Sequence, residues 1–354
     1  MSPYLSQIIQ SMVNRNLETY YNKHKESVLV IGTVYGNERR VYGIGNIHPY
    51  TTTNYSELIY EIGSITKLFT TTLLAHLHHD RFLDIDDSLG QYIPLLPPDS
   101  PVTFRHLATH TSGLPEKQIW RKVRNLLDSE KSRDSCSTFS LSEAAFYLRR
   151  ASAESVGKTY RYSNAGIGLL GHILATEMQT SYEHAVQDMI TTPLEMPDTS
   201  IHLTSEGMTR LVPGYRGHRA APPIELNDFP GTGALRSTAS DLLTFLSAHM
   251  GVHPNREIFD IYSITQKNYF QKNNQFRIGL GWHQNAQDGI LYHSAGTHGY
   301  QSFIGFRPDL PFGVVILSNI RDHSHLNPTT MGMELLLAAK QGTKKADALG
   351  TSVS

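Results

Sequence analysis

Cysteine, net charge and long apolar runs are all scarce in this chain of 354 residues. Its single cysteine, Cys136, excludes a disulfide within the chain, and the polar residues around it predict a loop. Lysine and arginine together number 31 and the acidic residues 32, which argues against nucleic-acid and anionic-membrane partners. No run approaches the roughly 20 apolar residues of a membrane-spanning helix. A glycine-rich phosphate loop is also missing, so we expect no cofactor.

The N-terminal segment predicts an amphipathic helix and not a secretion signal. Ser2-Pro3 resembles a helix N-cap followed by proline at the first helical position. Leu5, Val13 and other apolar residues recur at helical spacing. Polar residues such as Gln10 and Asn14 interrupt the apolar core that a secretion signal needs. We therefore expect a cytoplasmic protein.

Strand-like segments lie near both ends of the chain, and helical patterns fill the middle. We predict a two-lobed α+β (α/β) fold in one catalytic domain, residues 1–340. An antiparallel sheet of N- and C-terminal strands, flanked by the terminal helices, would form one lobe (about 1–63 and 271–340), and an inserted, mainly helical segment (about 64–270) the other. Residues 341–354 predict a disordered tail. The expected strands are 27–35, 40–45, 290–293, 301–306 and 312–317, with a turn at Gly36-Asn37, and Asn327-Pro328 begins the last helix.

Ser64-Ile65-Thr66-Lys67 opens an apolar run that is typical of a helix. A serine and a lysine three positions apart lie on one face of a helix, one turn from each other. At the helix start, free backbone N–H groups and the positive dipole end would surround the serine oxygen. If burial keeps part of Lys67 neutral, it can take the proton of Ser64, as a base does for its nucleophile. The same tetrapeptide also fits an ordinary N-cap followed by a solvated lysine.

Two further motifs carry groups suited to acyl transfer. Tyr162-Ser163-Asn164 places a phenol and an amide just before an apolar helical run, where the phenol could shuttle a proton to a leaving group. His293-Ser294-Ala295-Gly296 joins two strand-like segments, and free N–H groups at a strand edge could polarise a substrate carbonyl. Taken singly, the first also fits a turn with Asn164 as N-cap, and the second a glycine-rich hairpin.

Together, the three motifs in this order resemble the serine β-lactamase and penicillin-binding-protein superfamily, and within it the branch of class C β-lactamases, DD-peptidases, D-aminopeptidases and esterases. Their separations are 98 residues (162 minus 64) and 131 residues (293 minus 162). Val102–Pro115 is similar to a specific loop of that branch, and 83–89, 233–242 and 313–319 match it too. The resemblance covers roughly residues 25 to 340.

The resemblance implies a role for each motif residue. Ser64 would be the acylated nucleophile and Lys67 its base or proton relay. Tyr162 would be the second acid and base, for the leaving group and then for the deacylating water. Asn164 would hydrogen-bond the substrate amide or orient Lys67. The backbone N–H groups of Ser64 and Gly296 would form an oxyanion hole, which lowers the free energy of the transition state by about 3 kcal/mol.

Three residues depart from the pattern of this branch. His293 stands where its β-lactamases have lysine, and a histidine that is mostly neutral at pH 7 is a poorer anchor for a β-lactam carboxylate. If His293 contacts an anionic substrate group, affinity should weaken as pH rises from about 5.5 to 7.5. Ala295 stands where most relatives have glycine, and its methyl group could crowd the strand edge that the substrate approaches. Glu195, where glycine is usual, is expected to be a surface change.

Eighteen histidines prompt a search for a metal site. His76, His78 and His79 lie close together, and His76 and His79 share a helix face. Neither a His-Glu-x-x-His motif nor a cysteine pair supports a site, so we expect no metal. His106 and His110, within the loop shared with the branch, are expected to be structural.

These patterns favour a serine hydrolase that acts through an acyl-enzyme on esters or on small peptide amides, such as those of D-amino acids. The partner would be a small ester, peptide or β-lactam-like molecule. His293 and the missing export signal count against a true β-lactamase. Two alternatives stay open: β-lactamase or acyltransferase activity on the same fold, and a sensor or binding protein that penicillin acylates without turnover. The acyl group, the leaving group and the oligomeric state stay open too.

Overall fold

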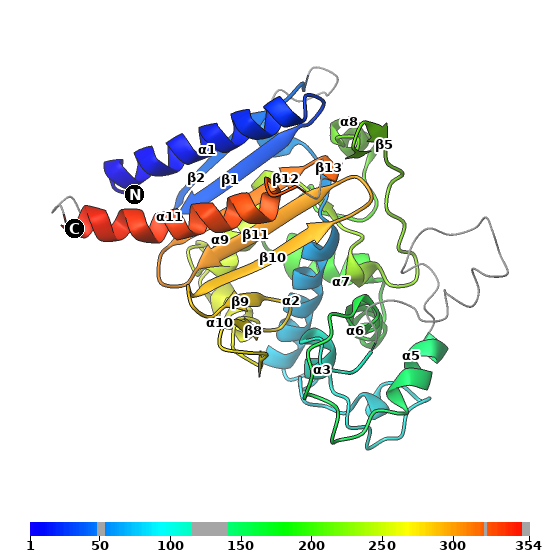
Figure 1. Ribbon diagram of the computed structural model, residues 1–354. Helices are drawn as coiled ribbons and strands as arrows, with labels where there is room; N and C mark the ends of the chain where they lie inside the picture. The colour runs from blue at the N-terminus through cyan, green and yellow to red at the C-terminus, as the bar shows by residue number, and fades with distance from the viewer. Residues whose placement is uncertain (48–53, 115–140, 322–323, 349–354) are drawn as a thin grey trace.

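An eight-stranded antiparallel sheet joins the two ends of the chain in the computed structural model (Figure 1). The structure describes residues 1–47, 54–114, 141–321 and 324–348; Cys136 and the loop predicted around it lie outside these ranges. The strand order is β2-β1-β12-β11-β10-β9-β8-β7, which confirms the sheet predicted from both ends of the sequence. Its strands are β1 (Leu29–Tyr35), β2 (Glu38–Ile44), β7 (Phe270–Gln271), β8 (Phe276–Ile278), β9 (His283–Asn285), β10 (Ile290–Gly296), β11 (Gln301–Arg307) and β12 (Phe312–Ser318).

The central strands are buried along almost their whole length. β1 and β12 pair from Leu29 opposite Ser318 to Tyr35 opposite Phe312. Both read as nearly continuous apolar runs, because helices cover both faces of the sheet. The predicted turn at Gly36-Asn37 joins β1 to β2, and Gly36 has the positive φ of 54° that a tight turn of this kind requires.

Three short strands at one edge of the sheet, β7 to β9, do not follow from the sequence pattern. They hold two or three residues each, and most of their side chains are only partly buried, so no clear alternation marks them. They extend the sheet beyond β10 and place His283 of β9 opposite Tyr292 of β10. This edge borders the candidate site described below.

Two long helices lie side by side over one face of the sheet (Figure 1). α1 (Pro3–Lys23) begins as predicted, with the Ser2 side chain capping its first turn. α11 (Pro328–Ala348) crosses β11 so closely that a Cβ at Gly332 would lie 2.2 Å from the ring of Phe303. Glycine is needed here because any side chain would collide with that ring.

The opposite face of the sheet is covered by α9 (Ala239–His249). A Cβ at Gly32 of β1 would lie 3.0 Å from a leucine of α9, so the helix and the strand are in close contact. α2 (Thr66–His79) packs against α9 through the stacked rings of Phe69 and Phe245, whose centres are 4.1 Å apart. Because α2 is buried on every side along most of its length, it forms the core of the molecule.

The predicted disordered tail is wrong in its first part, because α11 continues through residue 341 to Ala348. Gly342 is buried against α1, and a Cβ there would lie 2.7 Å from Leu5. The Thr343 hydroxyl donates to the Ala339 carbonyl at 2.9 Å. Packing against α1 therefore extends the helix beyond the point where its own apolar pattern ends.

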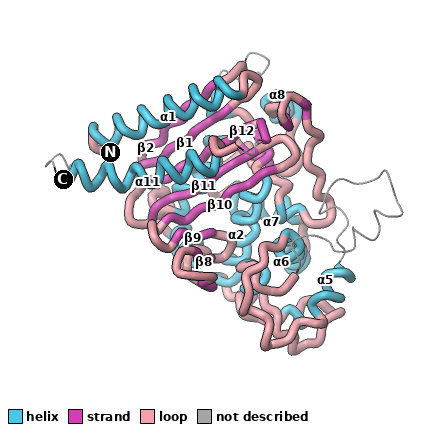
Figure 2. Tube along the Cα trace, in the orientation of Figure 1, coloured by secondary structure: helices cyan, strands magenta, loops and turns pink. Residues whose placement is uncertain are grey.

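The remaining α-helices of the described residues come from the middle of the chain (Figure 2), whereas two small sheets also take strands from the segments on either side of it. No helix in the described ranges has both the length and the apolar character that crossing a membrane demands. The helices are α3 (Phe104–Ala108), α5 (Leu141–Leu148), α6 (Asn164–Glu177), α7 (Tyr182–Val186), α8 (Ser205–Arg210), α10 (Glu257–Ile264) and the π-helix η4 (Gln187–Thr191). The 3-10 turns are η1 (Tyr55–Glu57), η2 (Gly63–Ile65), η3 (Leu89–Gln91) and η5 (Pro230–Thr232), and the short strands are β3 (Tyr60–Glu61), β4 (Tyr215–Arg216), β5 (Arg219–Ala220), β6 (Arg236–Ser237) and β13 (Ile320–Arg321).

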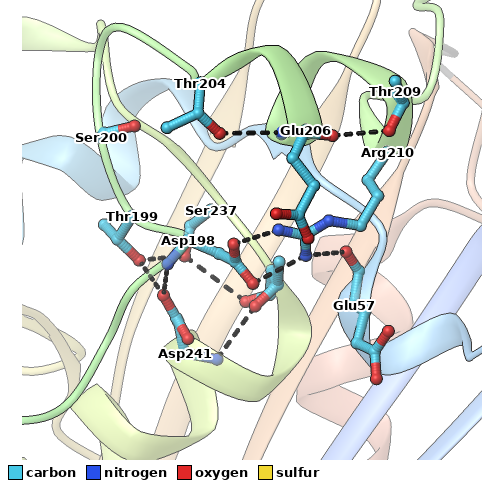
Figure 3. Close-up of polar contacts among 12 residues, drawn as sticks. Glu57, Asp198, Thr199, Ser200, Thr204, Glu206, Thr209, Arg210, Ser237 and Asp241 are labelled. Carbon is cyan, nitrogen blue, oxygen red and sulfur yellow. Dashed lines mark hydrogen bonds and ion pairs between the residues drawn. The ribbon is translucent and has the colours of Figure 1, made fainter. Parts of the chain in front are cut away.

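A polar network ties α8 to the start of α9 (Figure 3). Arg210 forms two parallel hydrogen bonds with the carboxylate of Asp198 and donates to the Glu57 carbonyl at 3.1 Å. Asp241 accepts hydrogen bonds from the Asp198 N–H at 2.9 Å and from the Thr199 hydroxyl at 2.8 Å. Burial raises the pKa of Asp241 to about 6, against the effect of these donors.

Candidate active site

Ser64 lies in the single helical turn η2, which leads directly into α2. Gly63 has a positive φ of 50°, and a Cβ there would come within 3.1 Å of Thr297 and 3.4 Å of Ala295. Glycine therefore allows the turn to pack against the end of β10. This packing brings Ser64 next to the strand that carries the third motif.

Lys67 reaches Ser64 from the first turn of α2. Its Nζ lies 3.0 Å from Ser64 Oγ and donates to the Thr232 carbonyl at 2.6 Å. The side chain has no exposed surface. Within the described residues no carboxylate forms an ion pair with it, so neutral groups alone hold this amine. Its distance from Ser64 Oγ is that of a hydrogen bond, along which a proton can pass between the two groups.

Tyr162 reaches Ser64 from the loop before α6. Its hydroxyl donates to Ser64 Oγ at 3.1 Å, and Lys67 Nζ lies 5.3 Å from the centre of its ring. The cap of α6 is Ser163, whose side chain accepts the Gly166 N–H at 3.0 Å; it lies one residue before Asn164. This cap fixes the backbone immediately after Tyr162.

Two motifs that lie far apart in the sequence therefore meet at one oxygen atom. Ser64 Oγ has an amine and a phenol hydroxyl within hydrogen-bond distance. One such neighbour can take the serine proton while the other supplies a proton to a leaving group. Chemically, this arrangement suits acyl transfer.

Asn164 lies in the first turn of α6, and its side-chain oxygen Oδ1 is buried without a hydrogen-bond partner among the described residues. Lys67 bonds to Ser64 and Thr232, so Asn164 does not orient it in this structure. The backbone carbonyl of Asn164 instead accepts the Thr232 hydroxyl at 3.0 Å. An unpaired buried acceptor costs about 1–3 kcal/mol, which a donor on a ligand would recover.

His293 is fully buried in β10. Its Nδ1 lies 2.9 Å from the Ser294 carbonyl oxygen, and its ring stacks on His283 with centres 4.8 Å apart. Burial, followed by the neighbouring His283 and Lys67, holds the pKa of His293 well below its ordinary value. A neutral ring without exposed surface offers no positive charge to an anionic group. The expected contact, and the change of affinity between about pH 5.5 and 7.5 that would follow from it, have no basis in this structure.

Two other histidines share the surroundings of Lys67. The ring of His110 lies against Tyr162, with centres 4.4 Å apart, and His283 lies against His293. Burial and the charge of Lys67 lower the pKa of His283 to about 4. Burial, His283 and Lys67 hold the pKa of His110 well below its ordinary value. All three rings are neutral at pH 7.

Gly296 ends β10 beside the turn that holds Ser64. A Cβ at Gly63 would lie 3.5 Å from the Gly296 carbonyl carbon, and Gly296 is exposed to solvent. The methyl group of Ala295 packs against the core and faces this turn, so it does not crowd the free strand edge. Gly296 and Ser64 are thus neighbours, as an oxyanion hole made of their N–H groups requires.

The three clustered histidines of α2 have separate surroundings. Burial lowers the pKa of His76 to about 4. His78 Nδ1 lies 3.7 Å from an Asp84 oxygen, and His79 Nδ1 lies 3.0 Å from an Asp80 oxygen. Within the described ranges no three His, Cys, Asp or Glu side chains are grouped as a metal site would require.

Thr232 and His110 complete the surroundings of the site, and sequence reasoning assigns neither a part in it. Thr232 acts through its backbone carbonyl, which any residue would supply; the one signal is the glycine-rich stretch 230–233. His110 is expected from the sequence to be structural, and the structure adds its direct contact with Tyr162.

Comparison with known proteins agrees with this geometry. A model of the family described as Beta-lactamase matches residues 13–334. The chain belongs to the Beta-lactamase family. It thereby falls within the superfamily of serine β-lactamases and penicillin-binding proteins, and this membership supports serine hydrolase activity in the broad sense.

Several relatives and solved structures are similar to this member of the Beta-lactamase family. A β-lactamase of Providencia stuartii is 30% identical over 198 residues, which cover 54% of this chain but only 47% of that protein. The D-alanyl-D-alanine-carboxypeptidase/endopeptidase AmpH of Escherichia coli K12 is 24% identical over 331 residues, 87% of this chain and 83% of AmpH. The class C β-lactamase structure from Rhodobacter sphaeroides matches with a TM-score of 0.75 at 24% identity, over 93% of this chain and 99% of that one. A β-lactamase/D-alanine carboxypeptidase structure from Pseudomonas syringae matches with a TM-score of 0.76 at 20% identity, over 94% of this chain and 99% of that one. The structural matches establish the fold.

Proposed function

We propose that the protein is a serine hydrolase that forms an acyl-enzyme on Ser64 and acts on esters or on amide bonds of small peptides. The observation that carries the proposal is the convergence of Lys67 Nζ and the Tyr162 hydroxyl on Ser64 Oγ, at 3.0 and 3.1 Å. Similarity to AmpH, which is named as a carboxypeptidase and endopeptidase, supports a peptide among the substrates.

The reaction proceeds in two half-reactions. Ser64 Oγ attacks the substrate carbonyl carbon and its proton passes to Lys67, while the N–H groups of Ser64 and Gly296 stabilise the oxyanion. The proton returns through Tyr162 to the leaving alcohol or amine as the C–O or C–N bond breaks. Water then attacks the acyl ester, gives its proton to the same pair, and the acid leaves as Ser64 Oγ regains a proton.

The surroundings of His293 favour esters and peptides over β-lactams. The ring is buried and neutral, so this position offers no cation to a β-lactam carboxylate. Hydrolysis of β-lactams is the second candidate, and the names of the relatives support it.

Steady-state hydrolysis of three substrates tests the proposal: a p-nitrophenyl ester, a D-alanyl-D-alanine peptide and a chromogenic cephalosporin. We expect kcat/KM for the ester or the peptide to exceed that for the cephalosporin by at least about tenfold. Ser64→Ala should lower every activity by at least about a thousandfold, whereas the exposed control Ser155→Ala should keep it. Faster cephalosporin turnover would identify a β-lactamase. Acylation by penicillin without turnover of any substrate would identify a binding protein.

A further inference from the structure

The loop that carries Tyr162 is held on both sides by one buried residue, His110. Arg161, just before Tyr162, donates its backbone N–H to the His110 carbonyl at 2.8 Å. Ser163, just after it, donates its N–H to His110 Nδ1 at 3.1 Å. The two rings lie against each other, with planes inclined by 35°. We propose that His110 is the positioning residue that aims the Tyr162 hydroxyl at Ser64, an inference that rests on the function proposed above.

The hydrogen bond from Ser163 determines which nitrogen of His110 carries the proton. A backbone N–H can only donate, so Nδ1 is the acceptor and the neutral ring carries its proton on Nε2. Nε2 is buried without a hydrogen-bond partner in the described part of the chain. A protonated ring would lose the bond from Ser163 and would place a positive charge near Lys67. The neutral ring therefore keeps the loop in place.

His110 also ends helix α3, but its backbone conformation shows that ending the helix does not by itself require histidine. Its φ of 59° lies in the left-handed region, where glycine and asparagine are the usual residues. Its N–H donates to the Leu107 carbonyl at 3.2 Å and so closes the end of α3. Glycine would close that end with less strain, but it would offer Ser163 no acceptor. The demand for histidine therefore comes from the Tyr162 loop.

Losing this acceptor should move Tyr162 without unfolding its surroundings. The Ser163 side chain still caps α6 through the Gly166 N–H, so the helix start is retained. The Arg161 bond to the His110 carbonyl is a backbone bond and also survives substitution. A reacting group that is misplaced by about 1 Å can lose about a hundredfold in rate. The expected signature is thus a folded protein with a displaced phenol.

Three substitutions at this position test the proposal. His110→Phe keeps an aromatic ring but removes the Nδ1 acceptor. His110→Gly relieves the backbone strain but removes both the ring and the acceptor. His110→Asn suits a positive φ and places Oδ1 where Nδ1 lies in histidine. We expect the Phe and Gly variants to lose about a hundredfold in kcat/KM, and the Asn variant less than about tenfold. Crystal structures should show the Tyr162 hydroxyl beyond hydrogen-bond distance of Ser64 in the first two variants and in place in the third.

A double-mutant cycle shows whether His110 acts through the phenol. In the background of Tyr162→Phe, the further change His110→Phe should cost less than about threefold. An equal loss with and without the phenol, or a Tyr162 hydroxyl that stays on Ser64 in both the Phe and Gly structures, would overturn the proposal. Failure of the wild-type protein to turn over any substrate would instead overturn the proposed function, and the crystal structures would still decide the placement of Tyr162. Thermal unfolding identifies variants that fold, and the Gly variant replaces the Phe variant if the latter does not.

Discussion

Two polar clusters of this molecule are built in opposite ways. In the network of Figure 3, the guanidinium of Arg210 forms hydrogen bonds with the carboxylate of Asp198, and Asp241 accepts two hydrogen bonds. Among the buried side-chain atoms of this network, Arg210 Nε is the one without a partner in the described part of the chain. Around Ser64, Lys67 is buried without an ion pair to any described carboxylate. Three polar atoms near it, in Asn164, His110 and His293, also lack partners among the described residues.

The difference teaches which cluster stabilises the fold and which is suited to chemistry. Paired charges and satisfied donors hold elements together, and removing one member leaves the other buried and unpaired. Unpaired groups at a site cost stability, and they are retained where a substrate or a proton transfer needs them. The first cluster should therefore govern stability and the second activity.

Replacing Lys67 should have the largest effect on activity with the least effect on stability. Lys67→Met keeps an unbranched side chain, shorter by one atom, and removes the amine, so acylation of Ser64 should slow by about a hundredfold to ten-thousandfold. The free energy of unfolding should change by less than about 1 kcal/mol, because the loss of the hydrogen bond to the Thr232 carbonyl is offset by removing the cost of burying an amine. Fluorophosphonate labelling rates and urea unfolding measure the two effects, with the exposed Lys345→Met as control. Labelling at the normal rate would remove Lys67 as the base.

Acid should destabilise the surroundings of the site by several kcal/mol. The pKa of His283 is lowered to about 4, and burial holds those of His110 and His293 well below their ordinary value. Folding therefore favours the neutral rings: their contribution to stability is complete above about pH 6.5 and is lost as pH falls towards the folded-state values. Urea unfolding between pH 7.5 and pH 4.5, with His283→Gln for comparison, measures the slope. We expect a smaller slope in the variant; equal slopes would exclude His283 as a source.

Breaking the Arg210–Asp198 cluster should have the opposite effect to that expected for Lys67: stability should fall and activity should be kept. Arg210→Met leaves the carboxylate of Asp198 without its cation in a position that is largely shielded from solvent. The free energy of unfolding should fall by about 1–3 kcal/mol, while kcat stays within about twofold. Arg256→Met, at an exposed position, should change neither. A large loss of activity in a folded Arg210→Met protein would contradict the division between the two clusters.

The smallest effect concerns Asp241 and has the opposite sign to that of the histidines. Its pKa is raised from 3.8 to about 6, so the folded protein holds the proton more tightly than the unfolded chain. This contribution therefore favours folding below about pH 4 and is lost as pH rises to about 6. Relative to wild type, Asp241→Asn should gain up to about 2 kcal/mol between pH 4 and pH 6.5. A constant difference between the two proteins would show that Asp241 does not titrate in this range.

The sequence predicts the parts of the fold that carry strong patterns. Buried central strands such as β1 and β12 appear as apolar runs, and Ser2-Pro3 marks the start of α1. The strands β7 to β9 are not predicted, because two or three partly buried residues are too few to show the alternation of apolar and polar residues that marks a strand. The end of α11 is misplaced because Gly342 gains its helical state from contact with α1, which no local pattern reveals.

The candidate site is predictable as far as side-chain chemistry reaches. Ser64, Lys67 and Tyr162 come from motifs, and the structure brings them together. The Thr232 carbonyl that binds Lys67 belongs to the backbone and has no residue signature. The burial of His293 and its position beside Lys67 depend on packing in three dimensions and could not be predicted from the sequence.

Mass spectrometry of the protein after reaction with a fluorophosphonate tests the central claim most directly. An activated serine attacks the phosphorus of the reagent and displaces fluoride, which leaves the serine oxygen phosphonylated. We expect one adduct, mapped by peptide digestion to Ser64, and none in Ser64→Ala. An adduct on another residue, or an unmodified wild-type protein, would contradict Ser64 as the nucleophile.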